Sequence, residues 1–319
     1  MIRFAAIGTS WITTQFADAV ARVPEAELSV VYSRDAGRAA SMAAQLGAPS
    51  WSADLDALLA SDEVDAVYVA SPNSVHAGQA RAAIRAGKHV LVEKPATPTS
   101  AEFSELVAEA EAAGVVVLEA MRTAYDPGAT RVRELLGSLG TIRRVSLRYA
   151  QRSSRYDLVL AGERVNIFDP AVAGGALNDL GIYCVSALVD WFGEPEQVRA
   201  AWIELPGGAD GAGAALCVHD GFVADVSWSK ITGSDVPSEV QGELATLVID
   251  HVPAPRALRL LRLDGSEERI ELDAPAFDLR YEVERFVQLC TERGDATSDH
   301  ARTLASLRTL EAIRAAATS

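Results

Sequence analysis

Three polar side chains have types and spacings that suit acid–base chemistry on a small molecule. Lys94 stands just after the apolar run 89–92 and just before Pro95. Asp179 and Tyr183 are four residues apart in a segment with a helical pattern, so both project from one face. A phenol, whose pKa is near 10, becomes a usable base when an ammonium lies beside it, and Lys94 could supply that ammonium. The alternatives are a lysine exposed at a strand end, a core tyrosine, and an aspartate that only orients its neighbours.

The elements that must position Lys94 follow a βαβ rhythm over residues 1–120. Short apolar runs predict strands at 3–7, 27–32, 65–70, 89–92 and 115–119. Longer amphipathic runs predict helices at 11–22, 35–46, 74–86 and 100–113. A parallel sheet of this kind, covered by helices on both faces, binds ligands at the carboxyl ends of its strands. We therefore expect Lys94 over the crevice in which a nicotinamide ring would lie.

The turn after the first strand, Gly8-Thr9-Ser10-Trp11-Ile12-Thr13, stands where a dinucleotide-binding fold places Gly-x-Gly-x-x-Gly. Gly8 permits the tight turn, and the helix that follows offers free N–H groups and the positive end of its dipole to a pyrophosphate. Ser10 and Thr13 replace the other two glycines, although both can donate to phosphate. The motif alone is equally compatible with an ordinary strand-to-helix turn.

The end of the second strand reads Ser33-Arg34-Asp35. An NAD enzyme usually offers an acid here to the ribose 2′-hydroxyl, whereas Ser33 and Arg34 offer donors to the 2′-phosphate of NADP. Arg38 follows one helical turn later and could assist. The pattern favours NADP over NAD, which is also possible. The alternative is a solvated turn with both arginines on the surface.

The rhythm changes after residue 121, which predicts a second domain. Residues 122–319 contain strand-like runs at 143–151, 197–205, 214–218, 223–228, 245–249 and 258–263, and helical patterns at 175–192, 277–291 and 298–317. The glycine-rich stretch 207–213 is typical of a hairpin loop. We therefore expect an α/β protein. Residues 1–121 would form a Rossmann-type, doubly wound parallel sheet, and residues 122–319 an α+β domain with an open, largely antiparallel sheet for substrate binding and oligomerisation.

Composition and charge exclude several classes of protein. The 44 acidic and 29 basic residues give a net charge of −15, so the surface should repel nucleic acids and anionic membranes. Cys184, Cys217 and Cys290 match neither a disulfide framework nor a metal spacing, and no other cluster of metal-ligating residues stands out. No apolar run approaches the roughly 18 residues of a membrane span, and the start has no signal-peptide pattern. We expect a cytoplasmic protein with no metal, no nucleic-acid partner and no membrane partner.

Four motifs, in order along the chain, resemble the Gfo/Idh/MocA oxidoreductase family over essentially its whole length. They are Ser71-Pro72-Asn73 with His76, the run Ala86 to Pro95, the run Glu119 to Arg122, and the run Gly174 to Tyr183. The resemblance implies hydride transfer between a nicotinamide cofactor and a secondary alcohol or carbonyl. It also implies a small-molecule substrate, namely a sugar, a cyclic polyol or a dihydrodiol, and a homodimer or homotetramer.

The resemblance further implies roles for single residues. Lys94 would polarise the reacting oxygen, held in place by Glu93 and by a Lys94-Pro95 bond that is often cis in the family. Tyr183 would be the general acid/base, because the chain is similar to the glucose-fructose oxidoreductase and dimeric dihydrodiol dehydrogenase branch, whereas many relatives carry His at this position. Further cofactor contacts are expected from Ser71, Asn73, His76 and Arg122.

Two polar segments before the Tyr183 helix are candidates for a wall that recognises substrate hydroxyls. Arg155 and Asn166 are the side chains expected to bind substrate there, together with Asp179, and the alternative is that both segments are plain loops. A catalytically inactive, NADP-binding regulatory protein is the alternative function. The presence of both Lys94 and Tyr183 argues against it.

Overall fold

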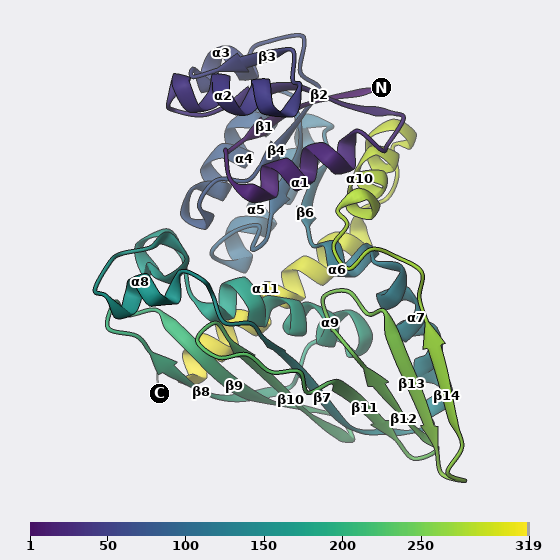
Figure 1. The fold of residues 1–319 in the computed structure, drawn as a ribbon. Coiled ribbons are helices and arrows are strands. Elements are labelled where there is room, and N and C mark those ends of the chain that lie inside the picture. The colour runs from purple at the N-terminus through teal and green to yellow at the C-terminus, as the bar shows by residue number, and fades with distance from the viewer. Residues whose placement is uncertain (318–319) are drawn as a thin grey trace. The chain divides into compact units, whose positions relative to one another are not determined.

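The chain folds into two compact units in a computed structural model that describes residues 1–317 (Figure 1). The first unit contains Met1–Arg122 and Asp278–Leu304, and the second contains Thr123–Phe277 and the chain from Ala305 onward. The predicted division at residue 121 placed all of 122–319 in the second domain. The structure differs there, because 278–304 returns to the first unit.

The first unit is built on a six-stranded parallel sheet in the order β3-β2-β1-β4-β5-β6. Its strands are β1 (Ile2–Ile7), β2 (Ala26–Tyr32), β3 (Ser50–Ser52), β4 (Ala66–Val69), β5 (His89–Glu93) and β6 (Val117–Ala120). Strands β1, β4 and β5 are almost fully buried, as expected for a parallel sheet with helices on both faces. The order reverses between β1 and β4, and ligands bind beyond the strand ends at such a point.

The helices of the first unit lie on both faces of this sheet (Figure 1). They are α1 (Trp11–Val20), α2 (Ala36–Leu46), α3 (Leu55–Leu59), the 3₁₀ turn η1 (Asn73–Val75), α4 (His76–Arg85), α5 (Ser100–Ala113), α10 (Arg280–Glu292) and the first part of α11 (Thr297–Ala317). The predicted helix ends at Gly47 and Gly114 are confirmed, since both glycines adopt the left-handed conformation as C-caps. Sequence analysis missed the short elements β3 and α3.

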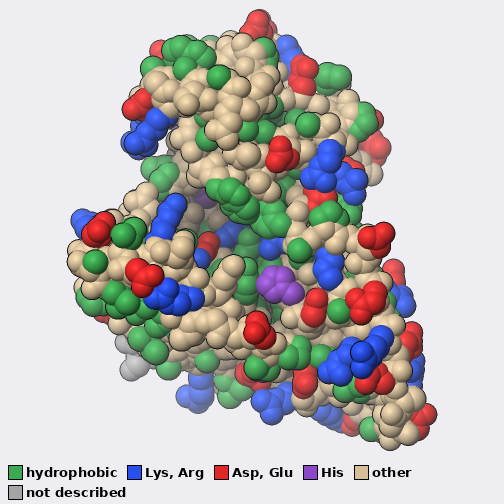
Figure 2. Space-filling model, in the orientation of Figure 1, with side chains coloured by type: hydrophobic (Ala, Val, Ile, Leu, Met, Phe, Trp, Pro, Cys, Tyr) green, Lys and Arg blue, Asp and Glu red, His purple; other side chains and the backbone are tan. Residues whose placement is uncertain are grey.

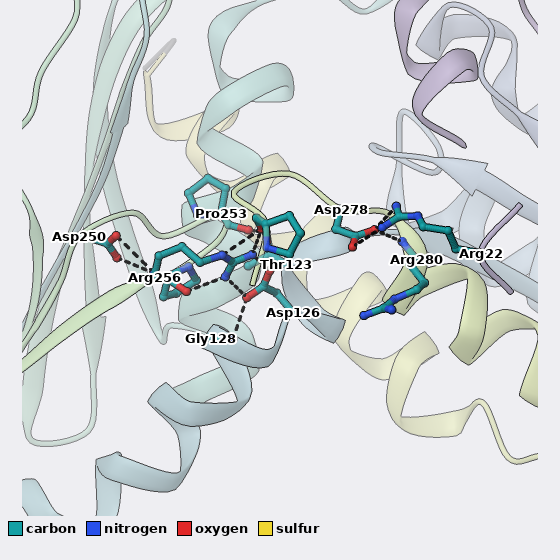
Figure 3. A network of polar contacts seen from close by, with 11 residues as sticks. Arg22, Thr123, Asp126, Gly128, Asp250, Pro253, Arg256, Asp278 and Arg280 are labelled. Atoms are coloured by element: carbon teal, nitrogen blue, oxygen red, sulfur yellow. Dashed lines mark hydrogen bonds and ion pairs between the residues drawn. The ribbon is translucent and has the colours of Figure 1, made fainter. Parts of the chain in front are cut away.

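Polar contacts explain why 278–304 joins the first unit (Figure 3). Asp278, whose side chain is almost fully buried, accepts two hydrogen bonds from Arg22 of α1, at 2.9 and 2.6 Å. Farther along, Thr303 donates to Glu119 at 3.1 Å, and the ring of Phe286 packs 5.6 Å from that of Phe4. These contacts cover the sheet with a helix pair that lies more than 150 residues away in the sequence.

The second unit is built on an eight-stranded sheet in the order β14-β13-β12-β11-β7-β10-β9-β8. Its strands are β7 (Ile142–Ala150), β8 (Gln197–Glu204), β9 (Asp210–His219), β10 (Phe222–Ser229), β11 (Ser238–Gly242), β12 (Ala245–Ile249), β13 (Ala257–Arg262) and β14 (Glu267–Glu271). All neighbours are antiparallel except β7 and β10, so the largely antiparallel sheet predicted here is confirmed. The predicted hairpin loop near 207–213 is shorter than expected, because β9 begins at Asp210.

The helices of the second unit include one that packs on the sheet at β7 and β10. They are α6 (Arg122–Tyr125), α7 (Pro127–Leu136), the 3₁₀ turns η2 (Gly137–Leu139), η3 (Asn166–Phe168) and η4 (Pro170–Val172), α8 (Tyr156–Leu160), the π-helical turn η5 (Leu177–Gly181), α9 (Ile182–Phe192) and the rest of α11. Arg256 anchors α7 to the sheet, because its guanidinium donates to the Asp126 carboxylate at 2.8 and 2.7 Å (Figure 3). Asp126 in turn caps α7 by accepting from Gly128 N.

One segment passes a length and composition test for a membrane span, contrary to the prediction that no apolar run came near it. Pro170–Phe192 has a mean hydropathy of 1.5 in its most apolar part, and 67% of that part is buried inside the fold. Residues 182–189 of α9 are all buried, and a helix that is covered all round is apolar for that reason. The segment is therefore explained as the core helix of the second unit.

The surface carries charges of both signs. Figure 2 shows acidic and basic side chains interspersed on the visible face. Several form exposed ion pairs, such as Arg143 with Glu243 and Arg131 with Glu134. Such pairs contribute little to stability. The expected lack of a nucleic-acid partner stays a prediction from the net charge of −15.

Candidate active site

The turn between β1 and α1 has the geometry that a pyrophosphate needs. Gly8 adopts φ +124°, and a Cβ at this position would lie 2.5 Å from the carbonyl oxygen of Ala70. Only glycine fits there. Ser10 is the N-cap of α1, and its side chain does not cap the helix. A helix N-terminus placed after such a turn suits an anion. Thr13 is fully buried and donates to Gly8 O at 3.2 Å, so it holds the turn rather than facing a phosphate.

An open pocket of about 490 Å³ lies beside this turn. Its lining residues are Thr9, Asp35, Gly37, Arg38, Ser41, Met42 and Gln45. Asp35 caps α2, since one carboxylate oxygen accepts from Arg38 N at 2.9 Å. Arg34 and Arg38 are both exposed, as are Ser10 and Trp11, while Ile12 and Ser33 are half-buried. The pocket thus brings Thr9 and Arg38 together, and Arg34 is not part of its lining.

Lys94 lies at the end of β5 in a tightly held loop. The Lys94–Pro95 peptide bond is cis, as the family resemblance implies. Glu93 accepts from the hydroxyl of Tyr68 at 2.6 Å and from Lys94 N at 3.2 Å. Tyr68 is itself fixed by its stacked contact with Phe16, at 3.7 Å between ring centroids. The backbone that carries Lys94 is therefore anchored to β4.

His76 supports the same loop from inside the fold. It is fully buried, and its ring nitrogens lie 3.0 Å from Pro95 O and 2.8 Å from Ser71 O. Burial lowers the pKa of His76, because the charged imidazolium loses its hydration. We predicted His76 as a cofactor contact, yet its ring ties the Ser71 loop to Pro95. Ser71 uses its hydroxyl on Gln79 at 2.6 Å, and Asn73 is half-buried at the start of η1.

Two buried carboxyl side chains, those of Glu119 and Glu282, and the half-buried one of Glu93 lie in the first unit. Glu119 accepts from Ala96 N at 3.0 Å, and burial raises its pKa. Burial also raises the pKa of Glu93. Glu282 of α10 is fully buried, both of its carboxyl oxygens lack a hydrogen-bond partner among the described residues, and burial raises its pKa well above the ordinary value. Arg122 is buried and interacts electrostatically with Glu93 and Glu282.

In the second unit, a π-helical turn carries Asp179 and leads into the helix of Tyr183. The sequence predicted one continuous helix over 175–192, but η5 makes a wider turn before α9 begins. Asp210 anchors its start by accepting from Leu177 N at 2.8 Å and from Trp228 Nε1 at 2.7 Å. π-Turns are rare and occur frequently at functional sites.

Tyr183 is buried at the head of a short chain of aromatic rings. The Tyr149 ring of β7 lies 5.8 Å from it, edge to face. His251, just beyond β12, lies 4.9 Å from Tyr149 in the same arrangement. Sequence analysis missed Tyr149 and His251. Tyr149 could have been found from the sequence. It lies in a predicted strand two residues after the buried Leu147, so both side chains point to the same face of the sheet.

Lys230, directly after β10, is the other polar residue that sequence analysis missed. Its ammonium forms a hydrogen bond and ion pair with the Asp179 carboxylate. The Lys230 side chain is only 8% exposed, whereas that of Asp179 is 30% exposed. A lysine 51 residues away from its partner leaves no pattern in the sequence.

The two predicted substrate-binding segments are helical turns held by a small apolar cluster. Phe168 packs with Leu205 and Ala209, and Tyr156 is among the partly buried side chains around them. Arg155, which precedes α8, and Asn166, in η3, are both exposed. Among residues 1–317, no group of three or more His, Cys, Asp or Glu side chains is arranged to hold a metal ion.

Comparison with known protein families places both units. Residues 2–121 match the model of an oxidoreductase family with a NAD-binding Rossmann fold, and residues 130–248 match the Gfo/Idh/MocA C-terminal domain. The chain belongs to the Gfo/Idh/MocA oxidoreductase family. The family resemblance and the fold class predicted from the sequence are thereby confirmed. Relatives of the chain among characterised proteins are NADP-dependent dehydrogenases and reductases, so the chain is a nicotinamide-dependent enzyme rather than an inactive regulator.

Several relatives of this Gfo/Idh/MocA protein have known names. It is 42% identical over 292 residues to scyllo-inositol 2-dehydrogenase (NADP(+)) IolU of Bacillus subtilis, covering 92% of this chain and 89% of that one. It is 31% identical over 316 residues to D-xylose 1-dehydrogenase (NADP(+)) 2 of Haloferax volcanii, covering 97% and 95%. Among solved structures, KijD10, a 3-ketoreductase from Actinomadura kijaniata in complex with NADP and TDP-benzene, superposes with a TM-score of 0.87 at 27% identity, covering 99% and 98%.

Proposed function

We propose that this oxidoreductase transfers a hydride between NADP and a ring carbon of a cyclic polyol, with an inositol as the substrate class. The observation that carries the proposal is the 42% identity to a scyllo-inositol 2-dehydrogenase that uses NADP, over 92% of this chain. Sugars are the second substrate class to test, because a D-xylose 1-dehydrogenase is 31% identical over 97% of the chain. Trans-dihydrodiols are the third, on the basis of a mouse relative that is 30% identical over 71% of the chain.

The preference for NADP over NAD rests on the end of β2. Arg34 and Arg38 supply positive charge there, and guanidinium groups suit a phosphate. Asp35, the acid that follows Arg34, uses a carboxylate oxygen to cap α2. Gly8, Thr9, Ser10 and the first turn of α1 would hold the pyrophosphate, and the bound cofactor would supply the hydride acceptor at nicotinamide C4.

Single residues are assigned to proton transfer and to substrate binding. In the oxidation direction, Tyr183 accepts the proton of the reacting hydroxyl, as the ring carbon becomes a carbonyl carbon. Lys94 polarises the reacting oxygen and favours the alkoxide-like charge that develops on it. Asp179 binds a further substrate hydroxyl through its half-exposed carboxylate. Arg155 and Asn166 are proposed to contact substrate as well, while Ser71, Asn73 and Arg122 are proposed on the cofactor side.

The protein is further proposed to form a homodimer or homotetramer through the open face of its second sheet. Register places Ile203, Leu216 and Val223 on one face of β8, β9 and β10, where they are 59%, 43% and 40% exposed. The opposite face carries the buried side chains that meet α9. Leu216→Lys should lower the mass measured by light scattering during gel filtration to that of a monomer. An unchanged oligomer, or a monomeric wild type, would remove this surface from the proposal.

A substrate panel tests the function. The wild-type protein is incubated with NADP⁺ or NAD⁺ and scyllo-inositol, myo-inositol, D-xylose, D-glucose or a trans-dihydrodiol, and reduced nucleotide is measured. We expect the highest kcat/KM with an inositol and NADP⁺. Higher kcat/KM with an aldose or a dihydrodiol would reassign the substrate class. No turnover of any compound by a protein that binds NADPH would contradict the proposal.

A further inference from the structure

We propose that Lys230 is a positioning residue for the reaction, acting through Asp179. Its buried ammonium would hold the Asp179 carboxylate charged and in one orientation, so that the carboxylate can bind the substrate hydroxyl next to the reacting carbon. The inference rests on the proposed function, because it concerns how that site binds a polyhydroxylated substrate.

Lys230 is the more deeply buried member of the pair, and Asp179 lies nearer to solvent. Lys230 is 8% exposed and its ammonium contacts the Asp179 carboxylate, which is 30% exposed. The lysine therefore lies behind the carboxylate as seen from solvent. A ligand that reaches the carboxylate meets an acceptor whose charge is balanced from behind.

The backbone around Lys230 makes the ammonium a fixed point. Lys230 N donates to Gly211 O at 2.9 Å, which extends the pairing of β10 with β9 by one residue. Two residues earlier on the same strand, Trp228 Nε1 donates to Asp210, and Asp210 accepts from Leu177 N. Residues at the end of β10 thus hold η5 at two points. Trp228 is linked to Leu177, the first residue of η5, through Asp210, and Lys230 binds Asp179 directly.

Gly175, which precedes η5, shows how closely Asp210 packs against this turn. Gly175 adopts φ +131°, and a Cβ there would lie 2.3 Å from Asp210 Oδ1. Arg314 adds a third contact by donating to Asn178 at 2.5 Å. Asp210 and Arg314 thus hold the residues on either side of Asp179 in sequence, and Lys230 binds the Asp179 side chain itself.

The choice of lysine is informative in this composition. Only three of the 29 basic residues are lysines, and the others are arginines. Lys94 is one, and Lys88, whose ammonium donates to Ser61 O and Val64 O at 2.7 and 2.8 Å, is another. Lysine carries a compact point charge on a flexible stem, whereas arginine carries a planar fork of donors, so the two are not interchangeable at Asp179.

A double-mutant cycle tests whether Lys230 acts through Asp179. We would measure kcat/KM with the best polyol and NADP⁺ for Lys230→Met, Asp179→Asn and the double variant. Lys230→Met should lose about 10- to 100-fold, as for the loss of a charge-assisted hydrogen bond. The double variant should be no worse than Asp179→Asn alone, because the lysine has no role once the carboxylate is gone. Losses that multiply in the double variant would overturn the proposal.

The cycle stays decisive if Lys230→Met fails to fold because it removes a buried ammonium that binds Asp179. Asp179→Asn keeps an amide oxygen that can accept from Lys230, and the double variant removes both charges of the pair, so these two variants can be compared directly. Equal kcat/KM for these two supports the proposal, and a further loss in the double variant contradicts it. Lys88→Met is the matched control. It also removes a lysine that makes two hydrogen bonds, but Lys88 makes no contact with Asp179, so kcat/KM should stay unchanged.

A substrate pair separates positioning from general damage. Wild-type protein and Lys230→Met are compared on a polyol and on its analogue that lacks the hydroxyl next to the reacting carbon. The wild type should prefer the polyol, and Lys230→Met should lose most of that preference, while the Kd for NADPH stays unchanged. An equal loss on both compounds would show a merely structural role. Absence of wild-type turnover would instead contradict the proposed function, so the two failures are distinct.

Discussion

Tyr183 is the residue on which the proposed proton transfer depends. Replacing Tyr183 by Phe removes the hydroxyl and keeps the ring that packs against Tyr149. We expect kcat to fall by at least about a hundredfold, the lower range for the loss of a general acid/base. Steady-state kinetics with the best polyol measures this loss.

Tyr149→Phe is the matched control for Tyr183→Phe. Its hydroxyl donates to Gln151 at 3.1 Å, and its ring stays in place in the variant. A similar loss of kcat in both variants would show that the aromatic cluster, and not the Tyr183 hydroxyl, is sensitive to change. A near-normal rate for Tyr183→Phe would assign the proton to Lys94 or Asp179 instead.

The two arginines after β2 carry the cofactor prediction. Arg34→Ala should raise the KM for NADP by about 10- to 100-fold, the loss of a charge-assisted hydrogen bond, and change the KM for NAD little. Arg38→Ala, measured separately, shows which guanidinium meets the 2′-phosphate. Arg85→Ala is the control, because Arg85 is an exposed arginine of α4 that pairs with Glu109. Equal effects on NADP and NAD would remove both arginines from the 2′-phosphate.

At this scale, the sequence predicted the residues that stand in motifs and missed those that tertiary folding brings in. Lys94, Asp179 and Tyr183 were recognisable because strand ends and helical spacing order them locally. Lys230 meets Asp179 only because β10 ends beside η5, a consequence of strand order in the sheet. Spacing along the chain contains no record of that order.

Among the elements, the β1–α1 turn makes the sharpest prediction. Gly8→Ala places a Cβ 2.5 Å from Ala70 O on a backbone with positive φ. We expect the Kd for NADPH, measured by calorimetry, to rise at least about tenfold, because the turn must move away from where the pyrophosphate binds. Gly47→Ala is the control, since Gly47 also has positive φ but nothing lies within 4 Å of its Cβ position.

The outcome of this pair separates strain from position. Gly47→Ala should cost about 1 kcal/mol of unfolding free energy and leave the Kd for NADPH unchanged. If both variants bind NADPH like the wild type, the close approach at Gly8 has no role in cofactor binding.

Elements were predictable where periodicity was long and strong. The five strands expected in residues 1–121 are all present, whereas β3 has three residues and leaves no alternation to detect. The π-turn η5 was missed for a different reason. Its residues continue a helical pattern, and the shift to a wider turn accompanies the contact of Leu177 N with Asp210, 33 residues away.

At the scale of the whole molecule, the buried carboxyl of Glu282 predicts how stability depends on pH. Burial, and then the charge of Glu93, raise the pKa of Glu282. Between the value of an unfolded glutamate, about 4.3, and the raised value, the folded state keeps a proton that the unfolded state has lost. The free energy of unfolding therefore falls as pH rises through this window.

Glu282→Gln removes this titration and keeps the shape of the side chain. We expect the variant to gain unfolding free energy relative to the wild type at about pH 8, and to gain less at about pH 5, in urea titrations. Glu284→Gln on the same helix is the control, because its side chain is half-exposed and pairs with Arg280. A difference between Glu282→Gln and wild type that does not vary with pH would contradict the raised pKa of Glu282.

The two-unit organisation was predictable from the change of rhythm near residue 121, but the return of 278–304 to the first unit was not. An amphipathic helix such as α10 has an apolar face that could cover either sheet. Its assignment depends on partners such as Arg22 with Asp278 and Thr303 with Glu119, which are far apart in the sequence. The membership of a helix in a unit is therefore a tertiary property.

The central claim is hydride transfer from a polyol carbon to NADP. The most direct measurement mixes the wild-type protein with NADP⁺ and an inositol deuterated at its ring carbons, and analyses the nucleotide by mass spectrometry. We predict one deuterium in the reduced nucleotide, with the label lost when Lys94 is replaced by Met. A protein that binds NADP⁺ but transfers no deuterium from any inositol, sugar or dihydrodiol would contradict the account.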